Sequence, residues 1–279
     1  MKTKNDFIKI LVEANIPLNE AKIEVELILE KVTGKKLEEL LFVNEFDEAQ
    51  IMPYIKERIE TKKPIQYILG YSYFMGEKFI VNGDVLIPRD ETEILIREVN
   101  KEIFNGIKIL DIGTGSGIIP CMIGKYSKEK NYDAEILGVD ISNGAIHIAL
   151  DNVKRLNLIR TCIFRKSDLF SNIRSDEKFD IIVSNPPYIP KKMYETIQEE
   201  VKFEPYNALF TDDDDDGLYF YKKIIADAPK FLKKGGFIFF ELMQGQADDV
   251  FKILSDSGFK NIQIIKDLAN IERVIKARI

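Results

Sequence analysis

Apolar and polar positions follow two different periods along this chain, and the change between them divides it. In the first part the apolar positions recur every three or four residues, which predicts amphipathic helices. One helix is expected over Asn19–Thr33, with Gly34 as its left-handed stop, and another after Asp47, a candidate N-cap. Residues 1–70 are therefore expected to form a small helical bundle, either a structural cap or a partner-docking surface.

Short β-prone runs replace the helical period in the next segment. Gln66–Leu69 is one such run, and Lys78–Val81 and Val85–Ile87 are two more, separated by Asn82-Gly83 and one further residue. Asn-Gly between apolar runs favours a β-hairpin. We therefore expect residues 71–88 to be a β-hairpin linker between two domains.

From residue 89 to residue 279 strand and helix patterns alternate, as a doubly wound parallel sheet requires. Helices are expected over Glu91–Phe104 and Leu218–Leu232, among others. The last two strands are joined by a turn too short for a crossover, so they should be antiparallel. The expected fold is α/β, with a mostly parallel seven-stranded sheet. Its strand candidates are Lys108–Ile112, Glu135–Asp140, Cys162–Arg165, Phe179–Val183, Phe237–Leu242, Gln263–Lys266 and Arg273–Ala277.

Composition and charge narrow the classes of function. The 279 residues include 45% hydrophobic ones, enough for a substantial core, and the net charge is −6. No broad basic field is present, which disfavours a dedicated nucleic-acid binder. No apolar run approaches the roughly 18 residues of a membrane span, and the charged start lacks a signal-peptide core. We expect a cytoplasmic protein.

Metal and redox chemistry have few candidate residues. Cys121 and Cys162 lie in no paired spacing and are expected to be buried free thiols. His147 is the only histidine, which excludes a His-rich metal site, and we expect it on the surface. The acidic tract Asp212–Asp216 lacks the ligand spacing of a calcium loop and is interpreted as solvated. No metal is expected.

The first candidate site is a glycine-rich turn between a strand and a helix. Glycines there let the backbone approach a ligand closely and leave amides free at the helix N-terminus. The spacing differs from the Gly-x-Gly-x-x-Gly of dinucleotide-binding proteins. The candidate cofactor residues are Asp111, Gly113, Thr114, Gly115, Ser116 and Gly117.

Acidic residues end the next two strands. Asp140 closes one of them, ahead of a helix that Ser142 can cap, and its carboxylate can accept two hydrogen bonds from a ribose diol. Asp111 would be its partner in holding a nucleoside. Asp168 follows the third strand, where it could accept from an adenine amino group.

The third candidate site is Asn185-Pro186-Pro187-Tyr188, which comes directly after a strand that is expected to be buried. The prolines fix φ and lack N–H donors, so the turn offers carbonyl acceptors, to which Asn185 adds its side-chain carbonyl. Two rigid acceptors can grip both hydrogens of a planar NH₂ group. Tyr188 would offer an aromatic face to that group. Because the carboxyl ends of parallel strands share one edge of a sheet, we expect all three sites to meet there.

These residues resemble the class I S-adenosylmethionine-dependent methyltransferases, and the Asn-Pro-Pro-Tyr tip resembles those that methylate exocyclic or amide nitrogen. Further segments make the chain similar to the HemK/PrmC family, the peptide chain release factor glutamine methyltransferases. They are Pro64–Gly70, Val85–Glu93, Phe203-Glu204-Pro205, Ala208-Leu209, Asp216-Gly217-Leu218 and Lys266-Asp267-Leu268. Two positions depart from that family's pattern, Asp90 and Met243.

The resemblance implies a Rossmann-like fold, S-adenosylmethionine as cofactor, and the glutamine of the Gly-Gly-Gln motif in class I release factors as substrate. It implies cofactor contacts from the Gly113–Gly117 loop, from Asp140 on the ribose, from Asp168 and Leu169 near adenine, and from Asn185. Asn185 and the Pro186 carbonyl would accept from the glutamine amide, with Pro187 and Tyr188 packed on the substrate. Arg89, Thr92 and Glu93 would support the site, the helical bundle would dock the release factor, and the protein would be a monomer.

Three other functions remain open from the sequence. The nearest is an adenine-N6 or guanine-N2 methyltransferase acting on DNA or RNA, because an exocyclic amine presents the same NH₂ geometry. The glycine spacing disfavours an NAD-dependent oxidoreductase. A nucleoside sensor without catalysis would bind the cofactor and release it unchanged.

Overall fold

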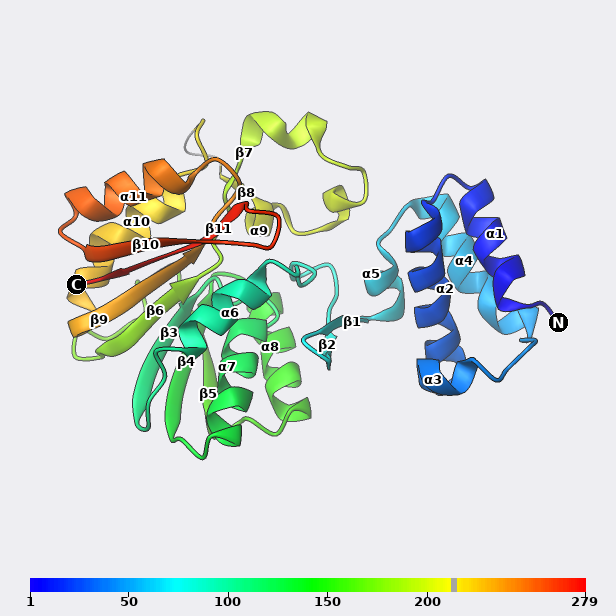
Figure 1. Cartoon of the computed structure of the whole chain (residues 1–279), viewed down its shortest axis with the longest axis horizontal. Coiled ribbons are helices and arrows are strands. Elements are labelled where there is room, and N and C mark those ends of the chain that lie inside the picture. The colour runs from blue at the N-terminus through cyan, green and yellow to red at the C-terminus, as the bar shows by residue number, and fades with distance from the viewer. Residues whose placement is uncertain (212–214) are drawn as a thin grey trace. The chain divides into compact units, whose positions relative to one another are not determined.

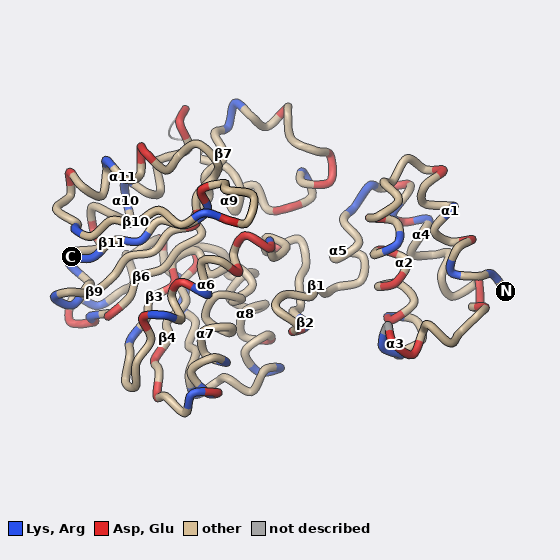
Figure 2. Tube along the Cα trace, viewed as in Figure 1, with Lys and Arg blue, Asp and Glu red and all other residues tan. Residues whose placement is uncertain are grey.

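The chain forms two compact units in a computed structural model that describes residues 1–211 and 215–279. One unit consists of Met1–Tyr71 together with Gln198–Phe203, and the other of Ser72–Ile197 together with Glu204–Ile279. In both units Lys and Arg are interspersed with Asp and Glu along the chain (Figure 2). Residues 212–214 of the predicted acidic tract lie outside the described residues.

The first unit is helical. Two sequence predictions are confirmed in it: the Asp47 side chain caps its helix by accepting from the Ala49 amide, and Gly34 ends the longest helix in a left-handed conformation, at φ 68°. The buried faces of the helices share one apolar core. Its helices are α1 (Lys4–Glu13), α2 (Leu18–Thr33), α3 (Leu37–Leu40), α4 (Glu48–Thr61) and α5 (Ile65–Leu69).

A buried arginine joins the distant segment Gln198–Phe203 to this unit. The Arg58 side chain is 2% exposed and donates to Glu24 at 2.7 Å, to Glu20 at 3.0 Å and to Glu200 at 2.6 Å. Burial raises the pKa of Glu24 to about 7, although the Arg58 charge opposes this. Because Glu200 belongs to the segment, the ion pair fastens residues far apart in the sequence.

The second unit contains a seven-stranded sheet in the order β10-β11-β9-β6-β3-β4-β5. Strands β5, β4, β3, β6 and β9 are parallel, and β10 and β11 are antiparallel, as their short connection predicts. The predicted fold class is confirmed. The strands are β3 (Ile107–Ile112), β4 (Ala134–Asp140), β5 (Cys162–Lys166), β6 (Phe179–Ser184), β9 (Leu232–Glu241), β10 (Lys260–Lys266) and β11 (Glu272–Arg278).

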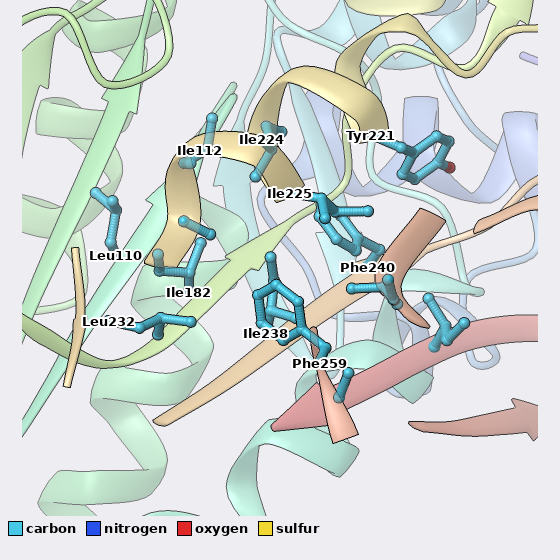
Figure 3. Close-up of a cluster of buried hydrophobic side chains, with 14 of the residues drawn as sticks. Leu110, Ile112, Ile182, Tyr221, Ile224, Ile225, Leu232, Ile238, Phe240 and Phe259 are labelled. Carbon is cyan, nitrogen blue, oxygen red and sulfur yellow. The ribbon is translucent and has the colours of Figure 1, made fainter. Parts of the chain in front are cut away.

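Helices cover both faces of this sheet (Figure 1). Helices α10 (Tyr219–Asp227) and α11 (Ala247–Asp256) pack on the face that carries Leu110 and Ile112 of β3, where Figure 3 shows the apolar cluster. Helices α6 (Thr92–Asn100), α7 (Ile118–Glu129) and α8 (Asn143–Arg155) pack on the other face. Burial on both faces explains why the parallel strands are almost continuously apolar.

The segment between the units differs from the prediction. The predicted β-run Gln66–Leu69 is helical, because it lies in α5 between Pro64 at the N-cap and Gly70 in the left-handed conformation. The hairpin consists instead of β1 (Tyr71–Phe74) and β2 (Glu77–Ile80), joined at Met75-Gly76, where both φ angles are positive.

The predicted turn at Asn82 therefore joins no pair of strands. The Asn82 side chain accepts from the Asp84 amide at 2.9 Å, so the Asn-Gly signal marks a local Asx turn.

Two helices of the second unit end earlier than predicted. Helix α6 ends at Asn100, and α10 ends at Asp227, ahead of Pro229. Leu232, predicted as the last residue of that second helix, belongs to β9 instead. Cys121 and Cys162 are buried free thiols and His147 is exposed, as expected. The short elements are β7 (Ile189–Pro190), β8 (Phe210–Thr211), α9 (Tyr206–Leu209) and the 3₁₀ helices Lys191–Thr196, Val201–Phe203 and Ala228–Lys230.

Candidate functional site

A cavity of about 720 Å³ lies at the carboxyl ends of β5, β4, β3 and β6, entirely within the second unit. Open α/β sheets bind their ligands at this edge. Loops after all four strands line it, together with two further segments, one before α6 and one around α9. Of the predicted site residues, the lining contains Arg89, Thr92, Gly113, Thr114, Gly115, Ser116, Asp140, Asp168, Leu169, Asn185, Pro186 and Pro187.

The glycine loop after β3 is held open toward the cavity by its own backbone. Gly113, Gly115 and Gly117 all have positive φ, which an L side chain adopts only with strain. Gly117 does not line the cavity; a Cβ there would lie 3.0 Å from side-chain atoms of Ala149 and Phe164. Because Gly117 has no side chain, α7 can begin close to Ala149 of α8 and Phe164 of β5.

Asp140 connects this loop to the end of β4. One of its carboxylate oxygens accepts from the Gly115 amide at 2.9 Å, and the other accepts from the Ser142 amide at 2.9 Å. Burial raises the pKa of Asp140, and these backbone hydrogen bonds oppose the shift. A carboxylate has about four acceptor sites, so each oxygen can still accept from a ligand.

Asp111 lies beneath the loop rather than in the cavity lining. It is fully buried, and the Thr114 side chain lies beside its carboxyl group. Burial raises the pKa of Asp111 to about 7, and the Asp140 charge adds to the shift. The sequence predicts that Asp111 and Asp140 hold a nucleoside together, but of the two only Asp140 lines the cavity.

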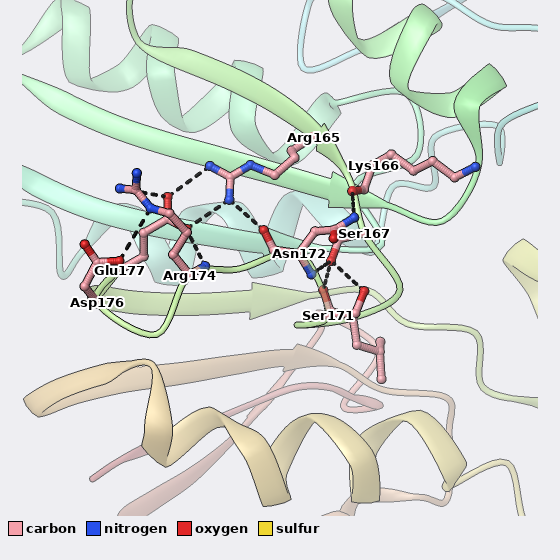
Figure 4. A network of polar contacts seen from close by, with 9 residues as sticks. Arg165, Lys166, Ser167, Ser171, Asn172, Arg174, Asp176 and Glu177 are labelled. Carbon is pink, nitrogen blue, oxygen red and sulfur yellow. Dashed lines mark hydrogen bonds and ion pairs between the residues drawn. The ribbon is translucent and has the colours of Figure 1, made fainter.

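A network of hydrogen bonds shapes the loop after β5 that carries Asp168 and Leu169 (Figure 4). The Ser167 hydroxyl donates to the Leu169 carbonyl at 2.7 Å and accepts from the Asn172 amide at 3.0 Å. Leu169 is held at φ 46°, a left-handed conformation that costs a side-chain residue energy. The loop is therefore preorganised at the cavity wall.

An ion pair at the base of the same loop fixes its two ends. The Arg165 guanidinium donates to both oxygens of Glu177, each at 2.9 Å, and also to the Asn172 carbonyl at 2.8 Å (Figure 4). The hydrogen bond from Arg165 lowers the pKa of Glu177 to about 2, so this pair is ionised at neutral pH.

The tip of β6 brings Asn185 beside the glycine loop. The buried Ser184 hydroxyl donates to the Ile112 carbonyl at 2.7 Å, which ties the ends of β6 and β3 together. A Cβ on Gly113 would lie 4.0 Å from the backbone carbonyl oxygen of Asn185. The Asn185 Nδ2 donates to the Thr92 hydroxyl at 3.4 Å, so the side-chain oxygen of Asn185 is left to accept from another group.

Tyr188 is not among the residues that line the cavity. It packs, partly buried, against the α10 and α11 core, and its backbone carbonyl accepts from Gln246 at 3.2 Å. A Cβ on Gly217 would lie 2.2 Å from that carbonyl oxygen, and Gly217 has φ +74°. Gly217 and Gln246 therefore hold the end of the turn, and Tyr188 braces it from the core side.

The aromatic wall of the cavity comes from residues that we did not predict. Tyr206 and Phe210 line it, with ring centroids 4.8 Å apart and planes 24° apart. They lie in the segment after Glu204-Pro205, which the sequence analysis singled out only through the resemblance. An aromatic pair next to such a Glu-Pro turn is the signal that could have indicated them.

Arg89 is tied to the same segment. Its guanidinium forms an ion pair with the buried carboxylate of Glu204, which also accepts from the Ile87 amide at 3.1 Å. Arg89 thereby fixes the wall that continues into Pro205 and Tyr206. The two departures from the family pattern, Asp90 and Met243, are not part of the cavity lining.

The cavity wall is acidic, because Asp84, Asp140 and Asp168 line it while the Arg89 charge is paired with Glu204. Within the described residues, no cluster of His, Cys, Asp and Glu has the arrangement of a metal site. Among the same residues, no helix is long and apolar enough to cross a membrane. The arrangement suits an organic ligand that carries positive charge.

Comparisons with known proteins match this arrangement. A family model described as "Methyltransferase small domain" matches residues 90–203. A release factor glutamine methyltransferase from Fusobacterium nucleatum is 42% identical over 240 residues, which cover 85% of this chain and 66% of that protein. Another, from Clostridium acetobutylicum, is 38% identical over an alignment of 291 residues that covers 99% of this chain and 98% of the relative.

A solved structure supports the fold alone. The T. thermophilus 16S rRNA N2 methyltransferase in complex with AdoMet and guanosine has a TM-score of 0.51 and 16% identity, covering 75% of this chain and 49% of that one.

Proposed function

The chain belongs to the family of release factor glutamine methyltransferases, and we propose that it methylates the side-chain amide nitrogen of the glutamine in the Gly-Gly-Gln motif of class I peptide chain release factors. The methyl donor is S-adenosylmethionine and the product is N5-methylglutamine. One observation carries the proposal beyond the family relationship. The rigid acceptors at the tip of β6 and the glycine loop after β3 line the same cavity.

The residues around the glycine loop fit this cofactor. Asp140 is already oriented by two backbone amides and can accept from the ribose, and the loop that Ser167 holds would bring Asp168 and Leu169 to the adenine. The buried carboxyl group of Asp111 lies beneath the loop that contains Gly113, Thr114, Gly115, Ser116 and Gly117. When bound, the cofactor supplies a methyl group activated by a positively charged sulfur, which the acidic wall complements.

The substrate side of the site has to aim a poor nucleophile. The lone pair of an amide nitrogen is delocalised, and positioning of two reactants can supply roughly 7 to 11 kcal/mol. Asn185 Oδ1 and the Pro186 carbonyl would accept both hydrogens of the glutamine NH₂. As positive charge develops on that nitrogen its N–H groups become stronger donors, so both hydrogen bonds tighten in the transition state. The proton then leaves to water.

Other residues complete the wall. Pro187 and Arg89 line the cavity beside Asn185, and Tyr206 and Phe210 offer apolar surface to the stem of the glutamine. Tyr188 supports the tip from behind through its buried packing.

The proposed cavity would hold the cofactor and the glutamine side chain, so the rest of a protein substrate would bind elsewhere on the molecule. We assign this docking to the helical region of residues 1–70, with residues 71–88 as the connection and 89–279 as the catalytic domain. The protein would act as a monomer in the cytoplasm, where release factors function.

A methyltransferase acting on adenine N6 or guanine N2 of nucleic acid is the alternative, because its target amine has the same geometry. The mixed distribution of basic and acidic residues along the chain weighs against it. Substrate binding that weakens steeply with salt would favour the nucleic acid.

Peptide mass spectrometry tests the proposal directly. The protein is incubated with S-adenosylmethionine and a purified class I release factor, and the added mass is mapped. We expect one methyl group on the glutamine of the Gly-Gly-Gln motif. A factor with alanine in place of that glutamine is the control and should gain no methyl group. Methylation of an oligonucleotide, with the release factor unmodified, would contradict the proposal.

A further inference from the structure

We propose that Glu241 is a positioning residue for Asn185: through the Thr92 hydroxyl, its carboxylate turns the Asn185 carboxamide so that the side-chain oxygen faces the substrate. The inference rests on the proposed function and adds to it a residue outside the cavity lining. Its consequence is that the protonation of one buried carboxyl decides whether the site presents an acceptor or a donor.

Two hydrogen bonds connect Glu241 in the core, through the Thr92 hydroxyl, to Asn185 at the cavity. Glu241 is the last residue of β9, which pairs with β6, and it is 2% exposed. Thr92 is the first residue of α6 and is 1% exposed, and its hydroxyl lies 2.6 Å from Glu241 Oε2. Asn185 Nδ2 lies 3.4 Å from the same hydroxyl oxygen.

Hydrogen-bond polarity determines which way the Asn185 amide points. An ionised carboxylate only accepts, so the single hydroxyl hydrogen of Thr92 must go to Glu241. The Thr92 oxygen is then left as an acceptor, and Asn185 has to present its NH₂ to it. The Asn185 oxygen, on the other branch of the amide, is thereby directed away from Thr92 and left for the substrate.

Protonation of Glu241 allows the opposite polarity. A carboxylic acid can donate to the Thr92 oxygen, which frees the Thr92 hydrogen to donate to Asn185. The carboxamide then gains by turning its oxygen toward Thr92 and its NH₂ toward the cavity. Two NH₂ groups would face each other, and a donor opposite a donor leaves the substrate amide without its partner.

Several charged groups around Glu241 decide where this change occurs. Burial raises the pKa of Glu241 to about 7, and the nearby Glu91 charge adds to the shift. The Thr92 hydrogen bond, the nearby Asn185 side chain and the Arg273 charge oppose it, and Arg273 is itself paired with Asp267 at 2.9 Å and Glu91 at 3.3 Å.

Two tyrosines, Tyr221, which is buried, and Tyr188, which is partly buried, also lie near Glu241. Tyr221 donates to its backbone carbonyl at 2.8 Å, and the charge of Glu241 helps to raise the pKa of the Tyr188 phenol. Both phenols stay neutral at physiological pH because their pKa values are raised, so of these three side chains only the Glu241 carboxyl titrates near neutral pH. The competent form is ionised, so turnover should fall as the pH drops below about 7.

The test is the pH dependence of kcat in matched variants. Wild-type kcat should fall about tenfold per pH unit on the acid side, as for any single required ionisation, with little change in KM. Glu241→Gln should lose this acid limb, because its amide has no proton to gain. Thr92→Val should lower kcat about tenfold or more through misorientation of Asn185, and Thr92→Ser, which keeps the hydroxyl, should restore it. Glu98→Gln, at a buried carboxyl on the same helix, should keep the wild-type limb.

A second readout needs no substrate. The ¹⁵N signal of the Asn185 side-chain amide should titrate with pH in the wild type and stop titrating in Glu241→Gln and Thr92→Val. An unchanged cofactor affinity and an unchanged midpoint of thermal unfolding would show that these variants are folded. An acid limb that persists in Glu241→Gln, or an Asn185 signal indifferent to the variants, would overturn the inference. Failure of the wild type to methylate a release factor would instead contradict the proposed function, and the NMR titration would still decide the positioning.

Discussion

Replacement of Asn185 by alanine is expected to lower kcat about a hundredfold or more, the effect of removing one preorganised donor or acceptor at a reacting centre. The reason is that Asn185 supplies the acceptor whose bond to the substrate amide strengthens as charge develops on nitrogen. Its carboxamide follows the end of β6 and is held by the hydrogen bond from Nδ2 to Thr92. Cofactor affinity should change little, because the proposed ribose and adenine contacts come from other strand ends.

Single-turnover kinetics with a saturating cofactor, together with titration calorimetry of S-adenosylmethionine, checks this separation. Asn207→Ala is the comparison, since it removes a carboxamide from the same cavity but from α9, and it should affect turnover far less. An Asn185→Ala protein that loses cofactor affinity as much as turnover would show that Asn185 holds the cofactor instead.

Replacement of Asp140 by alanine should act on binding first. Hydrogen bonds to charged groups contribute about 1.5 to 3 kcal/mol, so loss of the ribose contact predicts a Kd for S-adenosylmethionine about ten- to a hundredfold higher. The substitution also releases the Gly115 and Ser142 amides from their common acceptor, which loosens the glycine loop. At saturating cofactor most of kcat should return, because Asp140 takes no part in aligning the glutamine.

Titration calorimetry with S-adenosylmethionine and with S-adenosylhomocysteine measures the change. Asp151→Ala removes an exposed carboxylate from α8, the helix that follows Asp140, and should leave both affinities as they are in the wild type. An unchanged Kd in Asp140→Ala, with turnover lost, would contradict the assigned role.

The sequence predicted the parts of the fold in which local pattern and burial agree. The seven strands are apolar runs bounded by turns, and the short link through Asn270 requires an antiparallel final pair, so both were correct. The residues at the strand ends were predicted to share one edge, and Asp140, Asp168 and Asn185 do line one cavity. This succeeds because parallel strands have a common direction.

Other features depend on contacts that a one-dimensional pattern does not contain. The Asn82-Gly83 signal was assigned to a hairpin, but Asn82 makes a local turn, and the chain turns at Met75-Gly76 instead. The addition of Gln198–Phe203 to the helical unit depends on a tertiary ion pair through Arg58. Local propensity carries no information about either choice.

The site residues that the sequence did not predict also depend on tertiary contacts. Tyr188 follows the prolines directly, yet its side chain packs on the core, and the rings of Tyr206 and Phe210 reach the cavity from a later segment. Glu241 ends an apolar strand, and its connection to Asn185 through the Thr92 hydroxyl is visible only in the tertiary structure. A side chain that acts through another leaves no motif of its own.

The central claim is that a proline-framed pair of oxygens aims a glutamine amide at the donated methyl group. The most direct measurement is a crystal structure of the protein with S-adenosylhomocysteine and a release factor domain that carries the Gly-Gly-Gln loop. We expect the glutamine nitrogen within about 3.2 Å of both Asn185 Oδ1 and the Pro186 carbonyl oxygen, with its free side toward the cofactor sulfur. A glutamine bound away from Asn185, or a sulfur at the far side of the cavity from the tip of β6, would contradict the claim.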